Sequence, residues 1–99
     1  MADTRIGEYR LPPYVYASIT ADGAMLLDTR RRGTWFTVNP AGARLLHLLR
    51  DGKTLDQAVT ALAEFYRADR TTLWIDMAGL AAELIRRELL QQSAQESRT

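Results

Sequence analysis

The chain has 99 residues, of which 46% are hydrophobic and 25% are charged, and its formal net charge is +1. This length allows one domain with one modest core, and the nearly balanced charge gives no bulk attraction to nucleic acid or to a membrane surface. The absence of cysteine excludes disulfides, thiolate metal sites and a thiol nucleophile.

Three short runs typical of β-strands come first in the chain. Tyr14–Thr20 is rich in β-branched and aromatic residues, Ala24–Asp28 follows an Asp-Gly turn, and Thr34–Val38 is the third run. The short connections predict an antiparallel meander in which the first and third strands are the edges.

Three helices are predicted after the strands. Asn39 is a good N-cap with Pro40 at the first helical position, Thr54 caps the second helix, and Asp69 or Thr71 starts a third helix that runs to about Leu90. The apolar positions of the third helix form a wide stripe, which comprises Leu73, Trp74, Met77, Leu80, Ala81, Leu84 and Ile85.

These elements predict an α+β fold in which a three-stranded antiparallel sheet precedes three helices, an arrangement similar to a winged helix-turn-helix. We expect residues 12–90 to form the domain and residues 1–11 and 91–99 to be flexible termini. No apolar run approaches the ~20 residues of a membrane span, and the polar start resembles no signal peptide. The sequence therefore predicts a cytoplasmic protein without a membrane partner.

No constellation of catalytic or metal-binding residues is visible in the sequence. The single histidine, His47, is flanked by leucines, and two of the three serines lie near the C-terminus. The acidic residues are scattered over helical surface positions, whereas a metal site needs three or four convergent ligands. We expect neither an enzyme nor a cofactor.

We interpret the basic run Arg30-Arg31-Arg32 as a solvated turn that protects a sheet edge. The alternative is a basic hairpin tip that binds phosphate or an acidic peptide. A winged-helix DNA-binding regulator is an alternative function for the whole chain. However, the third helix carries Asp76, Glu83 and Glu88, and acidic faces repel phosphate. The sequence disfavours nucleic acid as a partner.

The third strand is the best candidate for a functional surface, because an extended peptide can pair with an exposed strand edge. Trp35 and Thr37 point to one side of the strand, and Phe36 and Val38 point to the other. Phe36 and Val38 are favoured to face the core.

The order and spacing of the apolar, Gly and Asn residues resemble the PqqD-like family over about residues 12–90. The residues that carry the resemblance are Leu27-Asp28-x4-Gly33-x-Trp35-Phe36-x-Val38-Asn39-x2-Gly42-x-x-Leu45-x2-Leu48-Leu49-x-Asp51-Gly52, Thr54-Leu55-x3-Val59, Phe65-Tyr66 and Asp76-Met77-x2-Leu80-x3-Leu84-x4-Leu89-Leu90. The chain departs from the family pattern at Val38, where many relatives have Leu, and at Glu88, where many have Gly.

The resemblance implies a non-catalytic adaptor that recognises the leader of a ribosomally made precursor peptide. Small stand-alone members with this composition are similar to the leader-binding partner of split lasso-peptide leader peptidases. The implied partners are then a precursor leader and a separate leader peptidase of the cysteine-protease type. A PqqD-like chaperone of another peptide-modification pathway, such as a quinone-cofactor pathway, is an alternative.

The resemblance also implies that the leader adds a strand beside the third strand and packs against the third helix. Trp35, Leu73, Met77 and Leu80 are suited to hydrophobic pockets for the leader. The expected leader-binding residues are Gly33, Thr34, Trp35, Phe36, Thr37, Val38, Leu73, Asp76, Met77, Leu80 and Leu84.

Overall fold

The computed structural model describes residues 8–31 and 34–93. The elements, in chain order, are β1 (Tyr9–Arg10), β2 (Val15–Thr20), β3 (Gly23–Asp28), β4 (Trp35–Val38), α1 (Pro40–Arg50), α2 (Leu55–Tyr66), α3 (Arg70–Arg86) and β5 (Gln91–Gln92). The predicted order of three strands followed by three helices is confirmed, and the strand bounds differ from the predicted ones by a residue.

The main sheet is an antiparallel meander in the order β2-β3-β4. The β2–β3 hairpin closes at the pair Thr20 and Gly23, and the β3–β4 register pairs Ala24 with Val38 and Leu27 with Trp35. Gly23 has φ +143°, a conformation that side-chain-bearing residues rarely adopt, so glycine is required at this turn.

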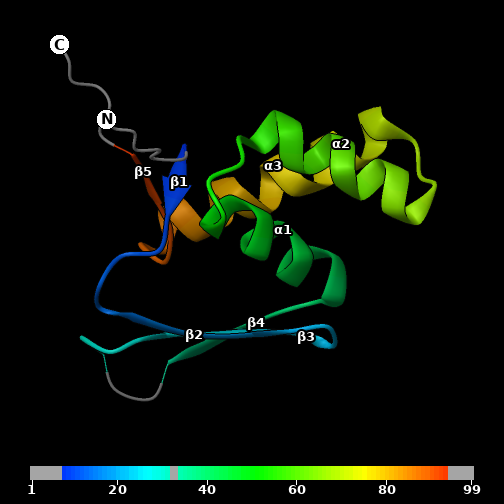
Figure 1. The fold of residues 1–99 in the computed structure, drawn as a ribbon. Coiled ribbons are helices and arrows are strands. Elements are labelled where there is room, and N and C mark those ends of the chain that lie inside the picture. Colours follow the sequence, from blue (N-terminus) through cyan, green and yellow to red (C-terminus); the bar gives the residue numbers. More distant parts are fainter. Residues whose placement is uncertain (1–7, 32–33, 94–99) are drawn as a thin grey trace, which may run out of the picture.

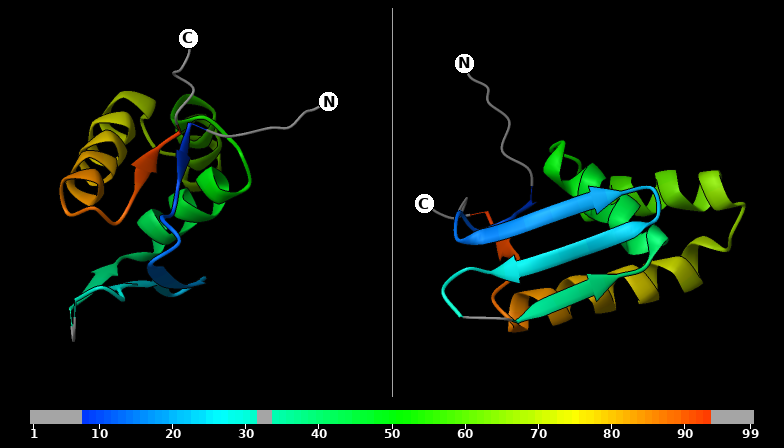
Figure 2. Two further views of the ribbon diagram at one scale, coloured as in Figure 1. Left: turned by 90° about the vertical axis from the view of Figure 1, so that its left-hand side faces the viewer. Right: turned by 90° about the horizontal axis from the view of Figure 1, so that it is seen from below.

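The sheet forms one layer and the three helices lie on one of its faces (Figure 1). α1 packs directly on the sheet, and α2 and α3 lie beyond it, as the two further views show (Figure 2). Leucines from α1, α2 and α3, including Leu45, Leu62 and Leu84, are fully buried together with Leu26 of β3. The other face of the sheet has no helix over it among the described residues.

Each helix begins at a residue that the sequence identifies. The side chain of Asn39 accepts a hydrogen bond from the Gly42 amide, and Thr54 forms a reciprocal capping box with Gln57. The carboxylate of Asp69 accepts from the Thr72 amide. The predicted caps Asn39, Thr54 and Asp69 are confirmed.

α3 ends four residues before the predicted end at about Leu90. Glu88 adopts a left-handed conformation with φ 63°. Its amide donates to the Ile85 carbonyl and the Leu89 amide donates to the Leu84 carbonyl, which is the double hydrogen bond of a Schellman C-cap. Because Leu89 is then buried against the core, the chain leaves the helix axis at this point.

A second, two-stranded sheet pairs residues from the two ends of the chain. β1 and β5 are antiparallel, with Tyr9 opposite Gln92 and Arg10 opposite Gln91. The carboxylate of Glu8 also accepts a hydrogen bond from the Leu55 amide at the start of α2. Here the structure differs from the predicted flexible termini, because two-residue strands carry no periodic signal. Residues 1–7 and 94–99 lie outside the described residues.

In the described part of the chain, none of the helices has the length and apolar character needed to cross a membrane.

Gly42 packs so closely against Val38 and Leu80 that one added methyl group should disturb this contact. A β-carbon at this position would lie 2.3 Å from Cγ1 of Val38 and 2.8 Å from Cδ2 of Leu80. We expect Gly42→Ala to lower the free energy of unfolding by about 1–3 kcal/mol because it overpacks this point. Urea denaturation measures the change.

Gly79 of α3 is the matched control, since a β-carbon there would meet nothing within 4 Å. Gly79→Ala should raise the free energy of unfolding by about 0.5–1 kcal/mol through its higher helix propensity. Equal effects of the two substitutions would contradict the close approach of β4, α1 and α3.

Candidate functional site

The candidate site is the free edge of β4. β4 pairs with β3 on one side, and no strand within residues 8–31 and 34–93 pairs with its other side. α3 runs alongside this edge, as the view from below shows (Figure 2). The edge therefore offers unpaired backbone groups next to a helix surface.

The side chains of β4 alternate between the two faces of the sheet. Val38 is buried in the core and Phe36 is half-buried against it, which confirms the predicted orientation of this pair. Trp35 points to the opposite, open face, where 47% of its surface is exposed and its ring meets Tyr16 edge-on at 6.4 Å. Trp35 therefore does not share a hydrophobic wall with α3, contrary to the expectation from the sequence, because the strand period separates it from Phe36.

One side chain of α3 and one at its C-cap reach towards β4. Leu80 is half-buried, and its side chain and that of Val38 both lie close to the backbone of Gly42. Near the end of the helix, Cζ of Arg87 lies 4.9 Å from the centre of the Phe36 ring, a cation–π contact. Arg87 is absent from the residues expected from the sequence, although its spacing of seven from Leu80 places it on the same helix face.

Asp76 and Glu83 share this helix face by spacing, and Asp76 is exposed. Glu83 forms ion pairs with Arg86 and with Arg87. Hydrogen bonds from these guanidinium groups, Arg87 first, lower the pKa of the Glu83 carboxyl. The face beside β4 is thus apolar at Leu80 and charged at its rim.

The other predicted residues of α3 lie in the core. Leu73, Met77 and Leu84 expose only 9%, 6% and 0% of their surface. They share a helix face with Leu80 by spacing, and Leu80 is the more exposed member of this face. Thr34 is exposed just before β4, and Gly33 lies outside the described residues.

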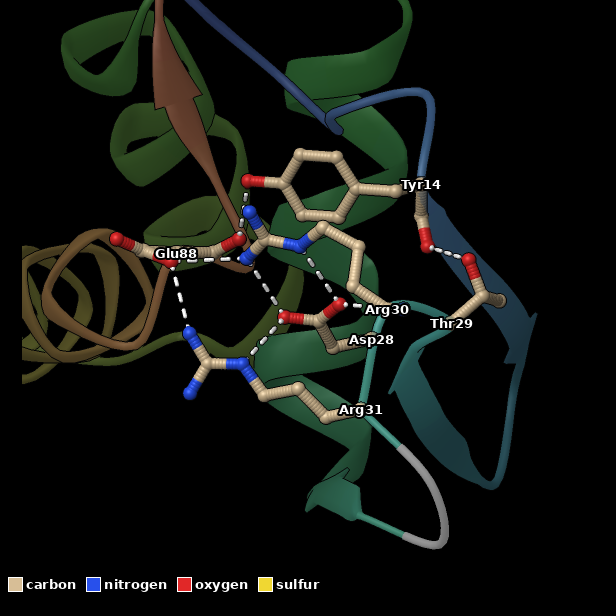
Figure 3. Close-up of polar contacts among 6 residues, drawn as sticks. All are labelled: Tyr14, Asp28, Thr29, Arg30, Arg31 and Glu88. Atoms are coloured by element: carbon tan, nitrogen blue, oxygen red, sulfur yellow. Dashed lines mark hydrogen bonds and ion pairs between the residues drawn. The ribbon is translucent and has the colours of Figure 1, made fainter.

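A polar cluster of Asp28, Arg30, Arg31, Glu88 and Tyr14 joins the β3–β4 loop to the end of α3 (Figure 3). We call it the Arg30 clasp. The Arg30 guanidinium donates two hydrogen bonds to the Asp28 carboxylate, at 3.0 and 2.8 Å. One oxygen of Glu88 accepts from Arg30 at 2.8 Å and from Arg31 at 2.9 Å.

Tyr14 completes the Arg30 clasp from the start of β2. Its hydroxyl donates to the Glu88 carbonyl at 3.0 Å, and its ring lies 3.7 Å below Cζ of Arg30 (Figure 3). The side chains of Arg30 and Arg31 are 43% and 58% exposed, as a solvated turn requires, but their charges are paired within the protein. Arg32 lies outside the described residues.

The buried carboxyl group of Asp28 has a lowered pKa. Hydrogen bonding from Arg30 is the largest cause that lowers its pKa, from the ordinary 3.8 to about 2. The pKa of Glu88 is lowered in the same way, first by its hydrogen bond from Arg30. Both carboxylates are therefore ionised whenever the protein is near neutral pH, and the Arg30 clasp stays closed.

Within the residues that the structure describes, no group of three or more His, Asp and Glu side chains could hold a metal ion. The one histidine, His47, lies exposed on α1.

Comparison with known proteins finds one matching family and three similar solved structures. The family model described as "Coenzyme PQQ synthesis protein D (PqqD)" matches residues 23–90. A solved structure described as "TbiB1 in Complex with the TbiA(beta) Leader Peptide" is 29% identical, with a TM-score of 0.74 over 86% of this chain and 98% of the other. No curated protein matches the chain.

A second solved structure, described as "Lasso peptide synthetase B1 complexed with the leader peptide", is 28% identical, with a TM-score of 0.75 over 86% of this chain and 99% of the other. A third is the PqqD part of Methylobacterium extorquens PqqCD, described as a stand-alone recognition element, with a TM-score of 0.68 over 85% of this chain and 88% of the other. At 24% identity, this third likeness shows the fold alone.

The Arg30 clasp predicts how stability depends on pH. Because the pKa of Asp28 is about 2 in the folded protein and 3.8 ordinarily, the unfolded state binds more protons between these values. We expect the free energy of unfolding to fall as the pH is lowered from about 4 to about 2. Asp28→Asn should be less stable at neutral pH and should show a shallower fall.

Glu88→Gln serves as the control. This variant keeps the Asp28 carboxylate and loses only the contribution of the Glu88 carboxyl to the pH dependence of stability. Urea denaturation at a series of pH values measures all three proteins. Parallel curves for wild type and Asp28→Asn would show that the carboxylate does not stabilise the fold through Arg30.

Proposed function

The chain belongs to the family of coenzyme PQQ synthesis protein D (PqqD), and from this premise we propose that it binds the leader segment of a ribosomally made precursor peptide. The resemblance to PqqD-like recognition elements drawn from the sequence motif is thereby confirmed. Two similar solved structures, at 29% and 28% identity, contain a leader peptide. We propose residues 12–90 as the recognition domain.

The observation that carries this proposal is the free edge of β4 beside α3. An extended leader would pair with β4 through backbone hydrogen bonds, which supply affinity without demanding a particular sequence. The edge strand and α3 are already held together by the Gly42 contact and by the Arg30 clasp. A preformed edge costs less conformational entropy on binding than one that must first be ordered.

The alternation of β4 divides the contacts of the bound leader between two faces. Alternate side chains of the leader would point towards α3 and contact Phe36, Leu80 and Arg87. The side chains between them would lie on the open face beside Trp35 and Thr37, as cross-strand neighbours.

The residues of α3 would have two different roles in this proposal. Leu80 contacts the leader, and Asp76 stands at the exposed rim where it can select against acidic leader residues. Leu73, Met77 and Leu84 support the helix from the core, because their surfaces are already covered by the protein.

We further propose that the protein is a non-catalytic adaptor for a separate leader peptidase of the cysteine-protease type. The chain contains no cysteine, so the nucleophile of a cysteine-protease-type peptidase would have to come from a separate subunit. An adaptor would hold the leader extended and raise its concentration at the peptidase. One of the similar structures is described as a lasso peptide synthetase B1, which supports a lasso-peptide pathway.

Leader binding should depend on α3 more than on the open face. We expect Leu80→Ala to weaken binding of the leader encoded beside this protein by about 1–3 kcal/mol, as for a buried anchor. Trp35→Ala should cost less, about 0.2–1 kcal/mol, as for a cross-strand neighbour. Fluorescence anisotropy with a labelled leader measures both affinities.

Trp74→Ala is the control, because Trp74 is exposed on α3 and lies against a different pocket, with Tyr9 and Leu55. The affinity of the Trp74→Ala variant for the leader should equal that of the wild-type protein. Unchanged affinity in Leu80→Ala with the fold intact would remove α3 from the site. Binding to DNA that falls steeply with salt, with no leader binding, would instead support the winged-helix regulator.

The adaptor role is tested by adding this protein to the separate peptidase and its full-length precursor. Cleavage should be faster when the wild-type protein is added. The Leu80→Ala variant should give no such increase when its concentration lies below its own Kd for the leader. An unchanged cleavage rate, measured where the leader is fully bound, would contradict the adaptor role while leaving leader recognition in place.

A further inference from the structure

A small pocket lies away from the β4 edge, between the end of β2 and the first half of α1. Its volume is about 220 Å³. The walls are mostly apolar and include Ile19, Ala21 and Ala43. Two basic side chains of α1, Arg44 and His47, complete the lining. The pocket thus combines an apolar interior with positive charge on one wall.

Arg44 lines this pocket and forms no ion pair with a described carboxylate. Its Cζ atom lies 3.9 Å from the centre of the Phe65 ring of α2, so the aromatic face fixes the guanidinium. The Nε atom of Arg44 is buried and has no hydrogen-bond acceptor among the described residues. Because Nε is buried, a ligand in the pocket would have to meet the terminal nitrogens of the guanidinium, whose positive charge favours a carboxylate.

Arg44 is the one half-buried arginine among the described residues, and the others are exposed. Carboxylates pair with five of them, namely Arg30, Arg31, Arg70, Arg86 and Arg87. The nearby His47 lies 3.6 Å from Asp51, on the exposed side of α1. The pocket therefore keeps one permanent positive charge that no described carboxylate neutralises.

The pocket also opens beside a second free strand edge. β2 pairs only with β3 within the described residues, and Ile19 and Thr20 at its end line the pocket. A peptide extended along β2 would bring a side chain to the pocket mouth. A single cation within apolar walls suits a carboxylate on a short apolar stem, whereas a phosphate dianion needs more donors.

We propose that this pocket binds the glutamate side chain of an acidic peptide that lies along the free edge of β2. The carboxylate would accept hydrogen bonds from the Arg44 guanidinium, and its methylene groups would contact Ile19 and Ala43. This second site does not use β4 or α3, and so it does not depend on leader recognition.

The test uses the full-length ¹⁵N-labelled protein and two blocked pentapeptides, which carry glutamate or glutamine between flanking valines. We expect the glutamate peptide to give saturable NMR shift changes at residues 19–21 and 40–47. The glutamine peptide should bind at least about tenfold more weakly, because it loses a charge-assisted pair. This comparison needs no substitution in the protein.

Arg44→Gln should reduce affinity for the glutamate peptide by the same factor, and Arg50→Gln is the control because Arg50 is exposed on the same helix. Equal affinity for the two peptides, or unchanged binding by Arg44→Gln, would overturn the proposal. Shift changes confined to β4 would also overturn it. If propionate binds as tightly as the glutamate peptide, the ligand is a free carboxylate, and the proposal of a peptide ligand is overturned.

Discussion

The contact of Val38, Gly42 and Leu80 is the constraint on which the rest of the structure depends. It brings β4, α1 and α3 together at one point, and only a residue without a side chain fits between the strand and the helix. The Asn39 cap and Pro40 start α1 directly after β4, which places Gly42 at this crossing. The edge strand is therefore fixed beside α3 at its C-terminal end.

The Arg30 clasp fixes the same pair of elements at the opposite end of β4. The buried Asp28 orients Arg30, and Glu88 at the end of α3 receives both Arg30 and Arg31. Glu88 adopts a left-handed conformation that disfavours side chains. Its carboxylate forms ion pairs with Arg30 and Arg31 from this position. Two separate contacts, one apolar and one ionic, thus hold an unpaired strand edge next to a helix.

Much of this fold can be predicted from the sequence, because its signals are local. The Asp-Gly turn, the alternation of Phe36 and Val38, and the caps Asn39 and Thr54 all act within a few residues. The parts that could not be predicted join distant segments. The β1–β5 pair spans the whole chain, and nothing local to Glu88 indicates that it meets Arg30. For the candidate site, the periodicity of α3 identifies Leu73, Met77 and Leu84 as apolar, but only packing shows that they are already covered.

Hydrogen exchange of the backbone amides on leader binding tests most directly whether β4 is the edge to which the leader adds. Amides of Trp35–Val38 that point to the free edge should exchange more slowly in the complex, in an alternating pattern, as those of a central strand do. The amides of β2 should be unaffected. Slower exchange at β2 alone, or no change in β4 at saturating leader, would contradict strand addition at this edge.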